Sequence, residues 1–536
     1  VFVRKSSLKI HENFTCKRQK FLTIEIIVQD GKKAVRGSCT AKCRRKRLVK
    51  KHKIAVGLAL AAWMTAGISG TALAAGGWVQ TDGNWKYTDS QGNYVTNRWE
   101  QSGGKYYYLG SDGNMVTNAW VDDLYYVGAD GVMVTNSWLK MNTAADGKEV
   151  GWYYLTSSGK MKTDGWETIN GREYAFDSDG RMRHGWYFDD EDIYYLGGED
   201  DGAMKTGWRC LAYDEDDKPD DGDVSEQYSQ AGDDARWFYF QTNGKAVHAE
   251  DGTYKRTTID NKKYYFDEDG VMASGWVAAE DETESGDTTG ISKFIYLGTE
   301  NEGNMYQSTW VYLDEHPWTG DDEDEIEEGD DEDCPDEGES AWYYLENDGT
   351  PAYLPSTADS MSDATTKVGS NSYFFNEYGV MRTGLIKISV GDENLVGYFG
   401  EDSPYDSSPD SYMRTGRQTI YDDAGDKYTF YFSTSGSSKG AGYSGERDDY
   451  LYYEGCLVEA EDGQDYEAFI IDGKAYLVNE SGRVQTSSKA YRCDGDYMYR
   501  ISGGKLYYTD DDGEAEDEVT EGSALPEVVY HEEYDL

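Results

Sequence analysis

The sequence predicts an all-β protein, a solenoid of stacked β-hairpin repeats with acidic loop insertions and an N-terminal signal helix. Three observations predict this class. Aromatic segments recur about every 20 residues along most of the chain, and a glycine falls six residues after the first aromatic in most copies. The glycine closes Asp-Gly, Ser-Gly or Asn-Gly pairs, which favour tight turns. Finally, 14% of the residues are aromatic and 46 are tyrosine, although only 38% are hydrophobic. Low hydrophobicity with high charge is otherwise typical of disorder, so we expect aromatic rings to form the core.

The first 74 residues read as a basic leader and signal peptide. Residues 1–53 carry 17 basic and three acidic side chains, and residues 54–74 carry none. The uncharged stretch closes with Ala72-Leu73-Ala74, and the order basic, apolar, small is that of a cleaved secretory signal. A membrane anchor is the alternative, but glycine and alanine dominate the stretch. We therefore expect an exported mature chain that starts at Ala75 and has no membrane span.

Residues 75–310 hold the most regular repeats. Each copy has two aromatics and an apolar residue, a polar turn with its glycine, a methionine or small residue, and then Thr-Gly-Trp or a relative. Two copies lengthen the turn by two residues, from Tyr194 to Gly202 and from Ile295 to Gly303. Strand, turn and strand in this length make a hairpin. Because an isolated hairpin is barely stable, we expect neighbouring copies to stack.

Acidic segments interrupt the tandem spacing at 214–223, 280–287 and 311–341, the last treated as a separate insertion. We expect them to be solvated, mobile loops. The Asp-rich turns at 177–180, 267–270 and 510–513 lack the further ligands and terminal glutamate of a calcium hand, so they are predicted to be turns. No metal site and no cofactor is predicted.

Residues 342–513 are degenerate copies, and 514–536 form an acidic tail. No tryptophan follows Trp342, and the position after Thr-Gly becomes Leu385 and then Arg417. The C-terminal copies should therefore keep the hairpin and hold few ligand sites.

Charge and motifs exclude two function classes. Residues 75–536 carry 34 basic and 99 acidic side chains, which disfavours nucleic-acid binding. The chain has no GxSxG or HExxH motif and its few histidines are scattered, so no enzyme is predicted.

At GGWVQTDGNWKYTDSQGNYVTNRW (76–99), KYYYLGSDGNMVTNAW (105–120), GWYYLTSSGKMKTDGW (151–166) and KKYYFDEDGVMASGW (262–276), the chain resembles the cell-wall-binding, or choline-binding, repeats of Gram-positive surface proteins. Related repeats occur in glucan-binding domains of glucansucrases. The resemblance implies a β-solenoid with aromatic cages between consecutive hairpins, where aromatic faces attract a quaternary ammonium group.

Carried over residue by residue, the resemblance implies these cages: Trp78, Trp85 and Tyr107; Trp99, Tyr106 and Tyr126; Trp120, Tyr125 and Tyr154; Trp138 and Trp152; and less complete ones opened by Trp166, Trp186 and Trp208. Hairpin packing is the alternative role for these tryptophans.

The sequence thus predicts a secreted, non-catalytic protein of the cell wall or cell surface. Its tandem sites would bind teichoic acid choline or a polysaccharide and gain avidity from their linkage. A neutral glucan-binding module is one alternative, and a structural or adhesive surface protein anchored by its N-terminal repeats is another. The sequence leaves the choice of ligand and the oligomeric state open.

Overall fold

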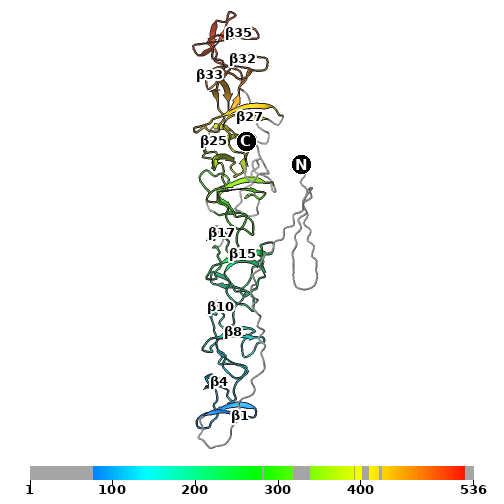
Figure 1. The fold of residues 1–536 in the computed structure, drawn as a ribbon, viewed down its shortest axis with the longest axis vertical. Coiled ribbons are helices and arrows are strands. Elements are labelled where there is room, and N and C mark those ends of the chain that lie inside the picture. Colours follow the sequence, from blue (N-terminus) through cyan, green and yellow to red (C-terminus); the bar gives the residue numbers. More distant parts are fainter. Residues whose placement is uncertain are drawn as a thin grey trace, which may run out of the picture. The chain divides into compact units, whose positions relative to one another are not determined.

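A computed structural model describes residues 76–250, 252–279, 283–317, 339–390, 393–400, 410–421 and 425–525. Within these ranges the chain forms 37 β-strands and one short 3-10 helix, η1 (Ile291–Lys293). The all-β prediction is confirmed (Figure 1). The predicted signal helix and its cleavage site lie outside the described residues. None of the described helices is long and apolar enough to cross a membrane.

The N-terminal sheets are mostly two-stranded antiparallel hairpins, as the repeat predicts. The pairs are β1 (Gly77–Thr81) with β2 (Asn84–Thr88), β3 (Arg98–Ser102) with β4 (Lys105–Leu109), β5 (Ala119–Val121) with β6 (Tyr125–Val127), β7 (Ser137–Met141) with β8 (Gly151–Leu155), β9 (Gly165–Ile169) with β10 (Arg172–Phe176), β11 (Trp186–Asp189) with β12 (Asp192–Tyr195), β16 (Lys255–Ile259) with β17 (Lys262–Phe266), β18 (Trp276–Ala278) with β19 (Phe294–Tyr296) and β20 (Thr309–Leu313) with β21 (Ala341–Leu345). Between β12 and β16, strand β13 (Gly207–Ala212) pairs with both β14 (Gln227–Tyr228) and β15 (Ala235–Phe240).

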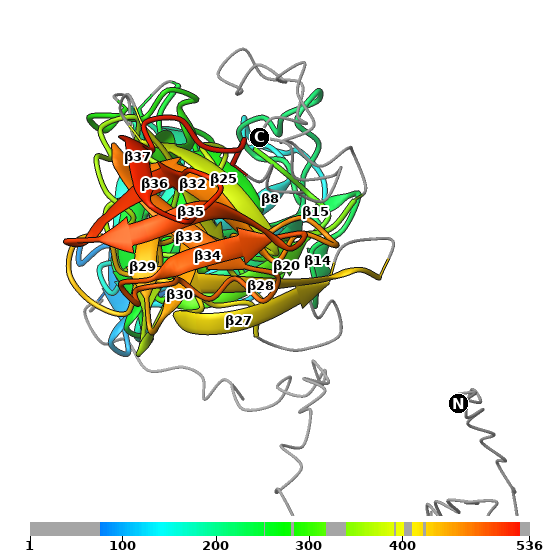
Figure 2. The ribbon, with the colours of Figure 1, turned by 90° about the horizontal axis from the view of Figure 1, so that it is seen from above.

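Three of the five C-terminal sheets are larger than the predicted hairpins, and Figure 2 shows β27 beside β28 in one of them. The five sheets comprise β22 (Thr366–Val368), β23 (Asn371–Phe375) and β24 (Met381–Arg382); the pair β25 (Leu385–Val390) and β26 (Glu393–Tyr398); the five-stranded order β27 (Gly416–Tyr421), β28 (Lys427–Phe432), β31 (Cys456–Leu457), β30 (Tyr450–Tyr453) and β29 (Gly445–Arg447); the pair β32 (Tyr466–Ile471) and β33 (Lys474–Asn479); and β34 (Ala490–Cys493), β35 (Asp496–Ser502), β36 (Lys505–Thr509) and β37 (Ala515–Glu518).

The methionine of each regular copy joins three consecutive hairpins. In the copy β9–β10, the backbone N–H of Met182 donates to the carbonyl of Trp152 in the preceding hairpin at 2.7 Å. The Met182 side chain lies against Gly202 of the following copy, where an added Cβ would be 2.3 Å from its sulfur. Gly202 also has a φ of +60°, so both its backbone conformation and the Met182 side chain favour glycine there. The glycine and the methionine of the repeat therefore help to stack consecutive hairpins.

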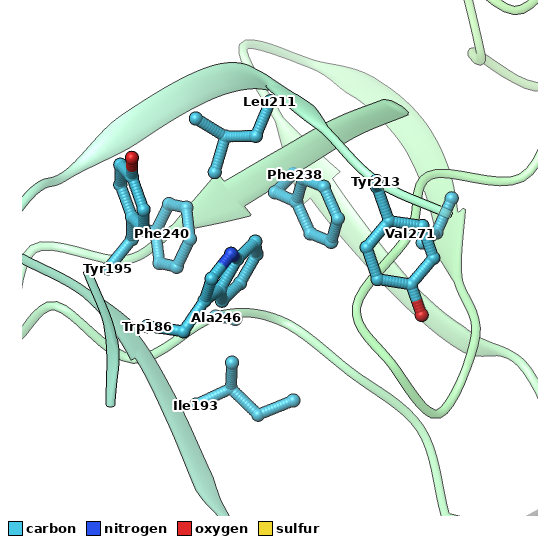
Figure 3. Close-up of a cluster of buried hydrophobic side chains, with 9 residues drawn as sticks. All are labelled: Trp186, Ile193, Tyr195, Leu211, Tyr213, Phe238, Phe240, Ala246 and Val271. Carbon is cyan, nitrogen blue, oxygen red and sulfur yellow. The ribbon is translucent and has the colours of Figure 1, made fainter. Parts of the chain in front are cut away.

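Aromatic rings fill the core of the N-terminal copies. Trp186, which is 1% exposed, packs against Tyr195, Phe238 and Phe240 (Figure 3). The C-terminal cores differ, because they are built largely from aliphatic side chains such as Leu385, Ile386, Ile388 and Val396. The expectation that rings form the core therefore holds for the first part of the chain and is wrong for the second.

Two segments expected to be loops or tail contribute strands. The predicted insertion 311–341 overlaps β20 and β21 at its ends, so the connection between these strands runs from 314 to 340. In the predicted acidic tail, β37 pairs with β36, and Val519 is buried.

The insertion 214–223 is not a free loop. Trp186 N–H donates to the carbonyl of Asp223 at 2.8 Å, and Gly222 N–H donates to the carbonyl of Trp186 at 2.8 Å. The C-terminal end of the segment is thus bonded to the start of β11, because backbone pairing is available at that open edge. Residues 214–218, 220, 221 and 223 are exposed, so the expectation of a solvated segment holds for most of its length.

Candidate ligand-binding cages

Four places in the described residues bring together two tryptophans of one hairpin and a tyrosine of the next. We name each by its first tryptophan. They are cage 78 (Trp78, Trp85, Tyr107), cage 138 (Trp138, Trp152, Tyr174), cage 208 (Trp208, Trp237, Tyr264) and cage 310 (Trp310, Trp342, Tyr373).

The four cages share one geometry. The two tryptophan ring centroids are 6.2–6.4 Å apart, and their planes make angles of 86–89°. The tyrosine of the next hairpin lies 4.7–4.9 Å from the first tryptophan. Such a box presents aromatic faces and edges, which can hold an organic cation by cation–π attraction or stack on a sugar ring.

Strand register sets this geometry. In the first hairpin, Trp78 pairs with Tyr87, and Gln80 pairs with Trp85. Residues two apart on a strand share a face, so Trp85 and Tyr87 lie on the same side as Trp78. Trp138 and Trp152 occupy the same register positions in β7 and β8, since Trp138 pairs with Tyr154 and Lys140 with Trp152.

The four cages differ in how much of their aromatic rings is exposed to solvent. All rings of cages 78, 138 and 208 are partly buried, so each keeps a solvent-facing side. In cage 310, Trp342 and Tyr373 are only 7% and 6% exposed, and Tyr312 lies 4.9 Å from Trp342. Cage 310 is therefore covered, and we call the other three open because all their rings remain partly exposed to solvent.

Two of the sequence-predicted groupings are wrong by one residue. Trp99 contacts Tyr125 at 5.5 Å, whereas Tyr126 packs at 5.4 Å on Trp120 of its own hairpin. Likewise Trp120 contacts Tyr153 at 5.5 Å.

The other residues of these groupings take different places. Tyr154 lies against Trp138, and Tyr106 pairs across the strand with Gln101 and is 43% exposed. Alternation along a strand explains the errors, because adjacent residues point to opposite faces.

The later tryptophans have different surroundings. Trp166 contacts Tyr194 at 5.0 Å and Tyr187 at 5.9 Å. Trp186 is fully buried, and its indole N–H donates to Ser225 Oγ at 2.9 Å, so it serves the core. The sequence predicts an incomplete cage at Trp208. Strand β15 pairs with β13 and places Trp237 beside Trp208, which completes the cage.

Six residues of the cages are absent from the groupings predicted from the sequence: Tyr174, Trp237, Tyr264, Trp310, Trp342 and Tyr373. The alternation of side chains along each strand carries the information that identifies the cage tyrosines. The tyrosine of each complete cage is the residue two before the apolar residue that ends the strand, as Tyr174 is before Phe176 and Tyr264 before Phe266.

Polar groups accompany two of the open cages. In cage 138, Trp152 Nε1 donates to Asp200 Oδ1 at 2.9 Å, and Lys140 Nζ lies 2.5 Å from the same oxygen. The Lys140 ammonium also lies 5.4 Å from the Trp152 ring centroid. Hydrogen bonds from Lys140 and Trp152 hold the pKa of the Asp200 carboxyl below its ordinary value. In cage 208, Trp237 Nε1 donates to Asn301 Oδ1 at 3.2 Å.

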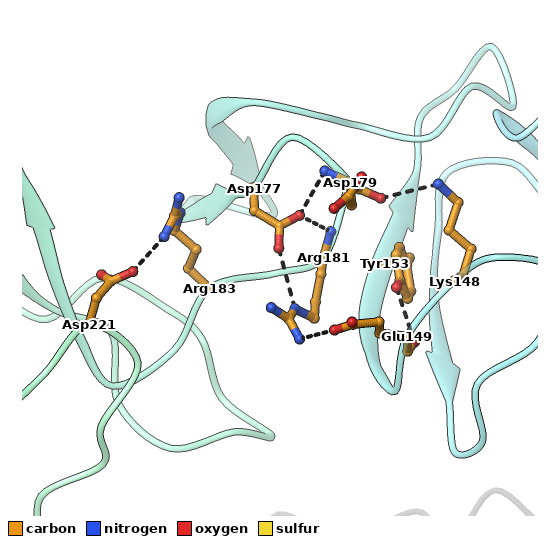
Figure 4. A network of polar contacts seen from close by, with 8 residues as sticks. All are labelled: Lys148, Glu149, Tyr153, Asp177, Asp179, Arg181, Arg183 and Asp221. Atoms are coloured by element: carbon orange, nitrogen blue, oxygen red, sulfur yellow. Dashed lines mark hydrogen bonds and ion pairs between the residues drawn. The ribbon is translucent and has the colours of Figure 1, made fainter.

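Ion pairs also join neighbouring copies (Figure 4). Arg181 bridges Glu149 at 2.8 Å and Asp177 at 3.3 Å, and Arg183 pairs with Asp221 of the acidic insertion at 2.9 Å. These side chains are substantially exposed, so each pair contributes little stability by itself. In the part of the chain that the structure describes, no three His, Cys, Asp or Glu side chains are grouped as metal ligands.

Comparisons with known proteins agree with the repeat. Choline-binding repeat families match residues 93–133, 114–148, 163–208 and 255–285, and a cell wall binding repeat family matches residues 151–161. No curated protein sequence matches the chain.

Three solved structures illustrate the structural similarity. The modular autolysin LytC from Streptococcus pneumoniae, in complex with a synthetic peptidoglycan ligand, is 21% identical over 59% of this chain, with a TM-score of 0.32. The chain spans only 55% of that autolysin. Choline binding protein F from the same organism, in the presence of a peptidoglycan analogue, is 19% identical over 66% of this chain and 98% of its own, with a TM-score of 0.31. ASR alternansucrase, in complex with isomaltononaose, is 14% identical over 81% of this chain and 22% of its own, with a TM-score of 0.18.

The fold, the recurring cages and the matched segments agree on one family. Residues 93–148, 163–208 and 255–285 carry choline-binding repeats, and residues 151–161 match a cell wall binding repeat.

Proposed function

We propose that this chain is an exported, non-catalytic protein of the cell wall or cell surface whose open aromatic cages bind choline-type ligands. The observation that carries the proposal is the shared geometry of cages 78, 138 and 208. Each sets two tryptophans at nearly a right angle, with a tyrosine of the next hairpin beside them. A quaternary ammonium group is the cation that such boxes favour.

Charge supports specific sites over general attraction. Residues 75–536 hold 99 acidic and 34 basic side chains. A wall rich in teichoic phosphate would repel such a chain. Attachment must therefore come from sites that recognise a cationic headgroup or a neutral sugar, and linked weak sites gain avidity.

Neutral glycan binding is the second candidate. Tryptophan and tyrosine rings also stack on sugar faces, and cage 208 favours this alternative. Its neighbouring polar group is the uncharged Asn301, and Cys210 stands opposite Trp237 in the strand register. The Trp-poor residues after 342 motivate the third candidate, a structural or adhesive protein that the N-terminal copies anchor.

Retention on choline resin, with glucan resin as the comparison, tests the proposal. We expect the chain to bind choline resin and to be eluted by free choline. A triple variant, Trp78→Ala, Trp138→Ala and Trp208→Ala, should lose retention, since each aromatic face contributes about 0.5–2 kcal/mol to a bound cation. Tyr421→Ala is the matched control, because Tyr421 is 56% exposed and lies outside the cages. Retention on glucan resin alone would exclude the choline proposal.

A further inference from the structure

Two turns of the solenoid each place a polar side chain against an open cage of an earlier hairpin. They are the two turns that are longer by two residues than the common repeat, 197–202 and 298–303, and we call them cap loops. Each belongs to the second hairpin after the cage it reaches. Asp200 and Asn301 occupy the same place, two residues before the turn glycine, and each accepts the indole N–H of a cage tryptophan.

The two cap loops are held differently. Asn301 Oδ1 also accepts the backbone N–H of Ala231 at 2.7 Å, so neutral hydrogen bonds fix cap loop 298–303. Asp200 is held by the Lys140 ammonium, which also lies over the face of Trp152. Cage 138 thus holds a cation of its own chain between a carboxylate and an indole ring. That is the set of groups that an alkylammonium ligand would use.

The strand register explains why only cage 138 carries this cation. The residue opposite the second tryptophan is Lys140 in cage 138 and Cys210 in cage 208. Cys210 is buried, so cage 208 has an uncharged residue at this register position.

We propose that the cap-loop residues set the charge selectivity of the two cages, with Asp200 selecting a quaternary ammonium ligand at cage 138 and Asn301 leaving cage 208 nearly indifferent to charge. Lys140 is an internal competitor at cage 138, which an incoming ammonium displaces from Asp200 and Trp152. The proposal rests on the proposed function, because it assumes that the cages bind ligand.

Reciprocal exchange of the two residues tests this. Asp200→Asn and Asn301→Asp are made separately in the full chain labelled with 5-fluorotryptophan, with the resonances assigned by Trp152→Phe and Trp237→Phe. Choline and its neutral isostere 3,3-dimethylbutan-1-ol are titrated by fluorine NMR. Either side chain offers an oxygen to the indole N–H, as Asn301 does for Trp237, so both variants should fold. An unmoved Trp186 resonance serves as the folding control, since that ring lies in the core.

We expect Asp200→Asn to lower the preference for choline over the isostere at Trp152, and Asn301→Asp to raise it at Trp237. Each change should be about three- to tenfold, as expected for one charge near a partly screened cation. Lys140→Met should tighten choline binding at Trp152 only. If choline binds the unaltered chain and neither exchange alters the preference, the cap-loop proposal is overturned while the proposed function stands. If neither ligand moves any cage resonance, the proposed function itself fails.

Discussion

Gly180 shows how one residue type serves both the turn and the stack. Its φ is +84°, and a Cβ added there would lie 2.6 Å from the sulfur of Met161 in the preceding copy. Gly83 has a nearly identical φ of +85°, but a Cβ there would meet nothing within 4 Å. Alanine substitutions at the two positions therefore allow the cost of backbone strain to be separated from the cost of packing.

We expect Gly180→Ala to destabilise its copy by about 2–4 kcal/mol, because left-handed backbone and overpacking each cost about 1–2 kcal/mol. Gly83→Ala should cost only the backbone share of about 1 kcal/mol. Amide exchange of β9 and β10 against that of β1 and β2 measures the two effects. Equal losses at both sites would show that the methionine contact contributes nothing.

The buried carboxyl of Asp267 should make the stability of the fold depend on pH. Its Oδ1 accepts the backbone N–H groups of Asp269 and Val271, and burial raises its pKa from 3.8 to about 6. Because the folded pKa lies above the unfolded value, the ionised carboxylate destabilises the fold above pH 6. This penalty disappears as the pH falls from 6 to 4. We expect Asp267→Asn to raise stability at pH 7 by about 1–2 kcal/mol and to flatten the profile between pH 4 and 6.

The asparagine should fit, because Asn376 closes the same turn by accepting the N–H groups of Tyr378 and Val380. Asp177→Asn is the control. Asp177 makes the same backbone contacts but pairs with Arg181, so its replacement should not stabilise. Denaturant unfolding at several pH values measures both variants, and equal behaviour would contradict the role given to the burial of Asp267.

At the scale of elements, the end of the acidic insertion is bonded to the start of β11 through Gly222 and Asp223. Two residues after the insertion, Ser225 Oγ accepts the indole N–H of the buried Trp186. Ser225→Ala would leave that donor without its acceptor, which costs about 1–3 kcal/mol.

We therefore expect Ser225→Ala to speed the exchange of the Trp186 and Gly222 amides, which pair the insertion with β11. Ser137→Ala, at an exposed strand end, is the control. Hydrogen exchange monitored by mass spectrometry follows both. Unchanged exchange in Ser225→Ala would mean that the backbone pairing alone holds the insertion.

At the scale of the whole molecule, ligand stabilisation should be confined to part of the chain. Copies in a repeat array are stabilised mainly by their neighbours, and the open cages lie between residues 78 and 264. A ligand at one hundred times its Kd adds about 2.7 kcal/mol at each site.

We expect choline to slow amide exchange in residues 76–279 and to leave residues 425–525 unchanged. The sheets of that second region rest on aliphatic cores and carry no tryptophan. Protection of residues 425–525 would place the binding function in the Trp-poor part and contradict the cage assignment.

The sequence by itself determined the class of fold and the placing of most hairpins. The period of aromatics and turn glycines is a local property, and tight turns follow directly from Gly at positive φ. It also placed Trp78, Trp85 and Tyr107 together correctly. Only the tertiary structure decided which tyrosine of a neighbouring copy completes a cage. A shift of one residue moves a side chain to the opposite face, and local pattern does not fix the register between hairpins. The roles of Trp237, Asp200 and the insertion beside β11 were likewise decided by chain segments that return from far along the sequence.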